Sequence, residues 1–175
     1  MKCLPDEKEH LAMNVRKWVS REYNGFHFYI EGKALSHARM VGSMLVTEAL
    51  VRGESARYVT SDDLVTAYFE TIRSKDKAPF PYKMSPFEEI NASRFVTLDL
   101  VGKDELEDWE KKCSQRMLTH RLNRGLSCAV IADRPLVALD GKGYDIANFL
   151  GASLQSSMYR TFVRCHLTAV EEVSC

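Results

Sequence analysis

The segment from Phe28 to Arg39 combines a short apolar strand, a glycine and the start of an amphipathic helix. This order is typical of a phosphate-binding loop, whose consensus is G-x-x-x-x-G-K-[ST]. Counted from Gly32, the second glycine, the lysine and the hydroxyl residue should stand where the chain has His37, Ala38 and Arg39. The sequence therefore predicts the strand, loop and helix of a nucleotide site without the residues that bind the phosphates and the magnesium ion.

Strands and helices alternate along the chain, as judged from the spacing of apolar residues and from the turn residues between them. We expect strands over 26–30, 56–60, 95–98, 127–132 and 162–168. We expect helices over 6–22, 35–52, 62–73, 86–91 and 104–123, with helical patches over 144–159. This pattern predicts an α/β domain with a mostly parallel five-stranded sheet.

Two further segments are irregular. Residues 74–86 contain three prolines, Pro79, Pro81 and Pro86, so an exposed loop is expected there. Gly141-Lys142-Gly143 is expected to form a turn, because it has neither the strand before it nor the helix after it that a phosphate loop requires.

The composition is that of an ordinary single globular domain of 175 residues, with 45% hydrophobic and 27% charged residues. The 24 basic and 24 acidic side chains balance, so net charge does not indicate nucleic-acid binding. No apolar run reaches the roughly 20 residues of a membrane span, and no signal peptide is evident. The five cysteines are widely spaced and argue against a zinc site. We expect a cytoplasmic protein without a metal or cofactor.

In the order and spacing of its segments, the chain resembles the AAA+ ATPase domain of bacterial replicative helicase loaders of the DnaC/DnaI type and of the related IstB transposition helpers. The similarity runs from about residue 10 to residue 170 and includes segments similar to the phosphate loop, the Walker B strand at 95–102 and the sensor 1 run at 121–133. The resemblance implies a P-loop NTPase-like three-layer sandwich. It implies a single domain over 1–175, with a short N-terminal helix over 6–22 and an α/β core over 26–170.

Residues that carry the chemistry of that family are replaced in this chain. The resemblance assigns the Walker B aspartate to Asp99, but Leu100 follows where the family has a second acid that orients water. Asp133 stands where sensor 1 is usually an asparagine, and Ser153 and Ser157 stand at two arginine positions. Loss of an arginine finger alone costs about 10³–10⁵ in rate. We therefore expect that the protein is not an ATPase.

A vestigial nucleotide site at the carboxyl ends of the strands would comprise Gly32, Lys33, Ser36, Arg39, Asp99 and Asp133. For Lys33 and Ser36 we favour a solvated loop residue and a helix cap over an anion site. For Asp99 we favour a strand-end carboxylate bonded to backbone amides over a magnesium ligand.

Basic side chains also gather on the helix expected over 104–123 and just beyond it. Arg116, Arg121 and Arg124 are candidate nucleic-acid contacts. The favoured interpretation is a solvated helix face that pairs with its own acids.

These observations favour a catalytically inactive AAA+-like domain that acts through protein contacts as an assembly or regulatory subunit. The resemblance implies that its partner is a replicative helicase, an initiator or an intact AAA+ paralogue. Two alternatives stay open. One is an unconventional nucleotide-binding protein that uses Lys33, Arg39 and Asp99 with little or no hydrolysis, and the other is a DNA-binding accessory subunit that uses Arg121 and Arg124.

Overall fold

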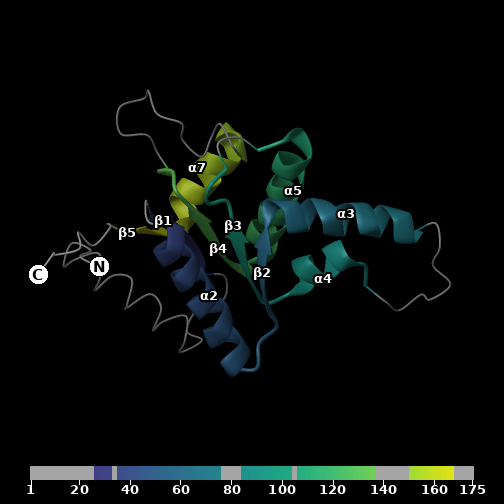
Figure 1. The fold of residues 1–175 in the computed structure, drawn as a ribbon, viewed down its shortest axis with the longest axis horizontal. Helices are drawn as coiled ribbons and strands as arrows, with labels where there is room; N and C mark the ends of the chain where they lie inside the picture. Colours follow the sequence, from purple (N-terminus) through teal and green to yellow (C-terminus); the bar gives the residue numbers. More distant parts are fainter. Residues whose placement is uncertain (1–25, 33–34, 76–83, 104–105, 137–149, 168–175) are drawn as a thin grey trace, which may run out of the picture.

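Five parallel strands form the centre of the computed structural model, which describes residues 26–32, 35–75, 84–103, 106–136 and 150–167 (Figure 1). The strands are β1 (His27–Gly32), β2 (Ala56–Thr60), β3 (Phe95–Asp99), β4 (Ser127–Ala132) and β5 (Phe162–Leu167). They pair in the order β2-β3-β4-β1-β5, and every pair is parallel. The predicted α/β fold with a parallel five-stranded sheet is confirmed.

Helices cover both faces of this sheet. They are α2 (Leu35–Val51), α3 (Ser61–Lys75), α4 (Pro86–Ala92), α5 (Asp108–Arg124) and α7 (Ala152–Thr161). Alternate residues of a strand point to opposite faces, so Phe28 and Ile30 join the core cluster of α2. Tyr29 joins the cluster that contains side chains of α3, α4, α5 and α7. Figure 1 shows α2 on one side of the sheet and α3 and α5 on the other.

One helix boundary differs clearly from its prediction. The helix expected over 104–123 begins only at Asp108. The reason is a capping interaction, because the Glu107 backbone N–H donates to Glu110 Oε2 at 2.8 Å and closes the helix start there. At the other end Gly125 adopts φ +61°, the left-handed conformation that ends helices.

Other predicted segments lie outside the described residues. These are the helix over 6–22, the turn at 141–143 and most of the loop over 74–86. Within the described part of the chain, no helix combines the length and the apolar character of a membrane span.

Gly42 allows α2 to lie close to the sheet. Its carbonyl oxygen accepts a hydrogen bond from Thr97 Oγ1 at 3.2 Å. A Cβ atom at this position would stand 2.9 Å from Thr97 Cγ2 and 3.2 Å from Ile131 Cδ1. Glycine is therefore required here by close approach rather than by backbone conformation.

Gly42→Ala is expected to lower the free energy of unfolding by up to about 2 kcal/mol. Overpacking costs about 1–3 kcal/mol, and the better helix propensity of alanine offsets about 1 kcal/mol of that cost. Urea unfolding measures the change. Ser43→Ala, at the exposed neighbouring position, is the control and should keep or slightly raise stability. A Gly42→Ala protein as stable as wild type would contradict the close contact.

His27 is buried at the start of β1. Its ring stacks on Phe162 with a centroid distance of 5.1 Å, and its Nδ1 lies 3.3 Å from Cys128 Sγ. Burial, and next the positive charge of Arg121, lower the pKa of His27 to about 4.

Stability is expected to fall in mild acid because of His27. The unfolded chain takes up this proton below about pH 6.5, whereas the folded chain takes it up only near pH 4. The contribution is therefore complete above pH 6.5 and is lost as pH falls from 6.5 to about 4, by up to about 3 kcal/mol. Urea unfolding across this pH range measures it. His27→Gln should show a shallower dependence on pH, and an unchanged slope would exclude His27 as its source.

Candidate functional site

The carboxyl ends of β1, β3 and β4 meet at one edge of the sheet, because β4 lies between the other two strands. Ligands of parallel α/β sheets bind at this edge. Gly32 ends β1, Asp99 ends β3 and Asp133 follows β4, and α2 begins three residues beyond β1. The structure thus brings these predicted site residues to one place. Lys33 lies outside the described residues, and Ser36 is described only as backbone in the first turn of α2.

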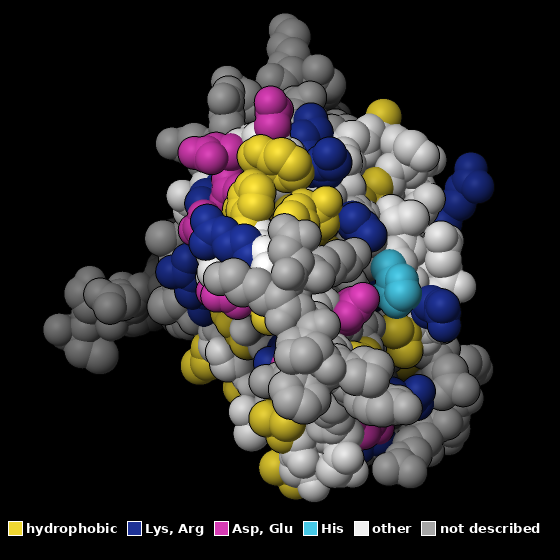
Figure 2. All heavy atoms as spheres, turned by 90° about the vertical axis from the view of Figure 1, so that its right-hand side faces the viewer, with side chains coloured by type: hydrophobic (Ala, Val, Ile, Leu, Met, Phe, Trp, Pro, Cys, Tyr) yellow, Lys and Arg dark blue, Asp and Glu magenta, His cyan; other side chains and the backbone are white. Residues whose placement is uncertain are grey.

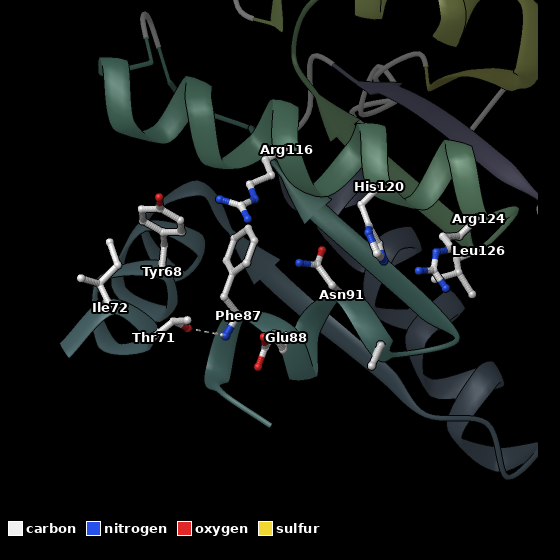
Figure 3. A pocket seen from close by; sticks show the side chains of 11 residues that line it. Tyr68, Thr71, Ile72, Phe87, Glu88, Asn91, Arg116, His120, Arg124 and Leu126 are labelled. Carbon is white, nitrogen blue, oxygen red and sulfur yellow. Dashed lines mark hydrogen bonds between the residues drawn. The ribbon is translucent and has the colours of Figure 1, made fainter. Parts of the chain in front are cut away.

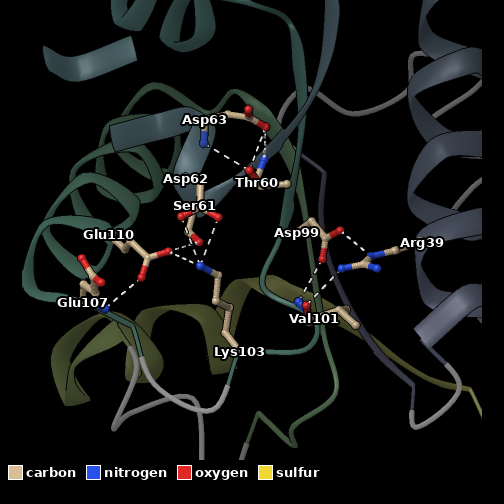
Figure 4. A network of polar contacts seen from close by, with 10 residues as sticks. All are labelled: Arg39, Thr60, Ser61, Asp62, Asp63, Asp99, Val101, Lys103, Glu107 and Glu110. Atoms are coloured by element: carbon tan, nitrogen blue, oxygen red, sulfur yellow. Dashed lines mark hydrogen bonds and ion pairs between the residues drawn. The ribbon is translucent and has the colours of Figure 1, made fainter. Parts of the chain in front are cut away.

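The Asp99 carboxylate is fully engaged within the domain (Figure 4). Its side chain is 4% exposed. Oδ2 accepts hydrogen bonds from Arg39 Nε at 2.8 Å and from the Tyr58 hydroxyl at 2.8 Å. Oδ1 accepts the Val101 backbone N–H at 2.9 Å. The predicted strand-end carboxylate bonded to a backbone amide is confirmed, with two side-chain donors in addition.

Arg39 supplies the positive charge at this carboxylate. Its Nη2 also donates to the Val101 carbonyl oxygen at 3.1 Å, so the guanidinium bridges α2 and the end of β3. The hydrogen bond to Asp99, followed by the negative charge of Asp99, raises the pKa of Arg39. Burial, and next the hydrogen bond to Asp99, raise the pKa of Tyr58 well above its usual range.

Because of this ion pair, the residue at position 39 has a different role from the one it has in a working phosphate loop. In a working loop the hydroxyl residue at that position and the Walker B aspartate share a magnesium ion. Here the guanidinium of Arg39 contacts Asp99 directly and neutralises it. A divalent cation would have to displace both Arg39 and the Tyr58 hydroxyl to reach the buried Oδ2 atom.

Three of the other substituted positions contribute to the fold, whereas the two serines on α7 are exposed. Leu100 is buried in the cluster on the opposite face of the sheet from α2. Ala38, where the loop lysine should stand, is fully buried against β1 and β4. Asp133 Oδ2 accepts the Gly102 backbone N–H at 3.1 Å. Ser153 and Ser157 are exposed on α7, and Ser157 Oγ donates to the Ser153 carbonyl oxygen.

A second polar cluster near this edge was not predicted. Lys103 Nζ lies 2.7 Å from Glu110 Oε1 and 3.1 Å from the carboxylate of Asp62, and Ser61 Oγ donates to Glu110 Oε1 at 2.6 Å (Figure 4). Burial alone would raise the pKa of Glu110, but the hydrogen bonds from Lys103 and Ser61 outweigh it and the pKa is lowered. The cluster ties α3 to α5. Ser61 and Asp62 lie at least 41 positions before Lys103 and Glu110, so no local pattern indicates the cluster.

The prediction that Arg121 contacts nucleic acid is wrong. Its side chain is fully buried and donates to the carbonyl oxygens of Ser127 and Arg94 at 3.1 and 3.0 Å. A guanidinium held in this way cannot reach a phosphate group. Arg116 and Arg124 are exposed on the outer side of α5 and line a pocket.

Solved structures of replication proteins share this fold. The DnaC helicase loader superimposes with a TM-score of 0.66 at 19% identity, covering 95% of this chain and 91% of that chain. DnaI gives 0.61 at 13% identity, covering 97% and 86%. Domain III of the Thermotoga maritima replication initiation protein DnaA gives 0.59 at 14% identity, covering 95% and 64%.

At these identities the likeness shows the fold alone: the chain shares the α/β fold of the DnaC helicase loader, DnaI and domain III of DnaA, as the sequence resemblance implied. No protein-family model matches the chain, and no curated protein matches it.

Proposed function

We propose that the chain is a replication-related AAA+-like domain that does not hydrolyse ATP and acts through contacts with other proteins. The observation that carries this proposal is the Arg39–Asp99 ion pair of 2.8 Å. It places a side-chain cation of the protein on the carboxylate that would otherwise hold the metal of the nucleotide.

Three further positions support the absence of hydrolysis. Leu100 is buried away from Asp99 and has no group that could orient water. Ser153 and Ser157 stand at the family's arginine positions and carry no charge to stabilise a phosphoryl transition state. These losses affect different parts of the reaction, so restoring one of them would not restore turnover.

The fold suggests the class of partner. DnaC is a helicase loader, and DnaA is a replication initiation protein. A domain of this fold without ATPase chemistry would bind a replicative helicase, an initiator or an intact AAA+ paralogue as an assembly or regulatory subunit. Purification of the tagged protein from its host, with mass spectrometry of what accompanies it, tests the partner class.

Titration with ATP and ADP, with and without Mg²⁺, tests the loss of nucleotide chemistry. We expect no binding at millimolar nucleotide and no release of phosphate. Asp99→Ala is the control, because phosphate release that persists in this variant comes from a contaminating ATPase. Turnover in the wild-type protein that Asp99→Ala abolishes would refute the proposal.

The two alternative hypotheses receive less support. An unconventional nucleotide site would use Arg39 and Asp99, which are bonded to each other. A DNA-binding surface would use Arg121, which is buried.

A further inference from the structure

A pocket of about 620 Å³ lies between α3, α4 and α5 (Figure 3). It includes Leu126, which precedes β4, so it sits toward the amino edge of the sheet, whereas the Asp99 site lies at the carboxyl edge. On this face of the molecule, basic side chains and a histidine border hydrophobic side chains (Figure 2). The volume is in the range of pockets that bind small molecules or short peptide segments.

One wall of the pocket is a row of basic side chains on α5. Arg116, His120 and Arg124 are four residues apart and therefore lie on one face of the helix. Figure 3 shows them projecting from α5 into the space next to α4. The two arginines are separated by about 12 Å along the helix axis, at about 1.5 Å per residue. Glu88 is the acidic residue among the pocket's lining side chains.

The facing wall is largely apolar. Tyr68 and Phe87 contact each other edge to face with a centroid distance of 5.5 Å. The guanidinium carbon of Arg116 lies 5.6 Å from the Tyr68 ring centre and 5.9 Å from that of Phe87, so the rings hold this cation in place. Ile72 is 42% exposed beside them.

Asn91 adds a polar group at the pocket wall. Its Oδ1 atom is buried and accepts no hydrogen bond within the described part of the protein. An unsatisfied buried acceptor costs about 1–3 kcal/mol. A ligand that offers an N–H group would remove that cost.

We propose that this pocket binds an extended acidic segment of a partner protein, with two carboxylates on Arg116 and Arg124 and an apolar side chain between them. An extended chain rises about 3.3 Å per residue, so its positions i and i+4 lie about 13 Å apart, close to the separation of about 12 Å between the arginines along the helix axis. Residues at i, i+2 and i+4 of such a chain point the same way. The fitting pattern is therefore acid-x-apolar-x-acid, and a backbone N–H of the segment would donate to Asn91. This inference rests on the protein-contact part of the proposed function.

A peptide fits the pocket better than a nucleic-acid strand does. Burial, and next the charge of Arg124, lower the pKa of His120, so near neutral pH it adds little positive charge. Two arginines are few for a polyanion, whose affinity grows with each phosphate neutralised, and the chain as a whole has no net charge.

Selection from a library of short random peptides displayed on phage tests the inference without assuming a sequence. Binding to the full chain is selected, with counter-selection on the Arg116→Gln/Arg124→Gln double variant. We expect the selected peptides to carry two acidic residues four positions apart, with an apolar residue midway between them. In fluorescence anisotropy the enriched peptides should lose at least about tenfold in affinity for the double variant, because a truncated charge pair costs about 2 kcal/mol or more.

Arg160→Gln on α7, an exposed arginine outside the pocket, is the matched control and should bind like wild type. Circular dichroism and thermal unfolding show that each variant is folded. The inference would be overturned if the selected peptides lack acidic residues or bind the double variant as well as wild type. It would also be overturned if no peptide is enriched on wild type relative to the double variant. A single-stranded oligothymidylate that binds wild type, loses binding in the double variant and is not displaced by the peptides would overturn it as well.

The ATP titration described above separates the two proposals. Failure of the peptide selection with no ATP turnover removes this inference and leaves the inactive AAA+-like domain standing. Turnover that depends on Asp99 removes the proposed function whatever the pocket binds.

Discussion

Arg121→Met is expected to lower the free energy of unfolding by about 3–5 kcal/mol. Arg121 is fully buried, and its guanidinium donates to backbone carbonyl oxygens from three segments. Nε donates to Ser127 at 3.1 Å, Nη2 to Arg94 at 3.0 Å and Nη1 to Asn91 at 3.4 Å. The side chain therefore joins α5 to the end of α4 and to the starts of β3 and β4.

The size of the effect follows from the buried carbonyl oxygens that lose their hydrogen-bond donor. Methionine fills most of the volume but donates no hydrogen bond, so several buried carbonyl oxygens lose their partner at about 1–3 kcal/mol each before relaxation. Burial already disfavours the charged form and lowers the pKa of Arg121 to about 10. The folded domain nevertheless keeps the guanidinium, because the carbonyl oxygens need a donor with this fork geometry.

Urea unfolding measures the loss, and Arg124→Met is the matched control. Arg124 lies almost one turn further along α5 and is exposed, so its replacement should change stability by less than about 0.5 kcal/mol. Arg121→Lys should fall between wild type and Arg121→Met, since lysine keeps the charge but not the fork. Equal losses for Arg121→Met and Arg124→Met would show that the carbonyl contacts contribute nothing.

The sequence did contain a signal for the position of Arg121. The buried side chains of α5 include Cys113, Met117 and Leu118, and Arg121 follows Met117 by four residues on the same stripe. An apolar stripe predicts which face of a helix is buried. The prediction that Arg121 contacts nucleic acid is wrong, because it treats the arginines of this helix as one basic surface and does not take the apolar periodicity into account.

The sheet was predictable because its strands are short apolar runs bounded by polar and turn residues. The strands at 56–60 and 127–132 were predicted to the residue. The start of α5 was not predicted correctly. Each of the acids at 104–108 suits the first turn of a helix, so the sequence does not show which of them begins α5. The hydrogen bond between Glu107 and Glu110, which is seen in the structure, fixes the start.

The chemistry of the candidate site was predictable only in part. Counting from Gly32 shows that the loop residues are missing, and this requires only local spacing. The sequence gives no indication that Arg39 contacts a carboxylate sixty positions away at 2.8 Å. That pairing depends on β3 ending beside the first turns of α2, which is a property of the sheet order.

Rebuilding the loop triplet as His37→Gly, Ala38→Lys and Arg39→Ser is expected to create magnesium-dependent nucleotide binding, whereas the proposed function expects none in the wild-type protein. Serine at position 39 removes the guanidinium from Asp99 and supplies the hydroxyl that holds Mg²⁺. Ala38 is fully buried, so a lysine at position 38 would pack its apolar stem in the core and extend its charged end to the β- and γ-phosphates. Glycine at position 37 lets the backbone approach the phosphates. All three changes are needed because each supplies a different contact.

Thermal unfolding with and without ATP and Mg²⁺ measures the gain. At a ligand concentration of ten times Kd the stabilisation is about 1.4 kcal/mol, which raises Tm by about 3–6 °C for a domain of this size. Arg39→Ser alone is the control that removes the guanidinium from Asp99, leaves the Tyr58 hydroxyl in place and does not rebuild the cradle, and it should show no shift with nucleotide. A wild-type protein that shifts as much as the triple variant would mean that the Arg39–Asp99 pair does not block the site.

The triple variant should still release no phosphate. Leu100 remains buried in the core and cannot orient water, and Ser153 and Ser157 remain uncharged on α7. Binding and hydrolysis are thus expected to separate in one protein, since the cradle at the start of α2 is rebuilt while the groups that act on the transition state are not. Turnover by the triple variant above that of its Asp99→Ala derivative would show that Leu100 and the two serines are not what prevents hydrolysis.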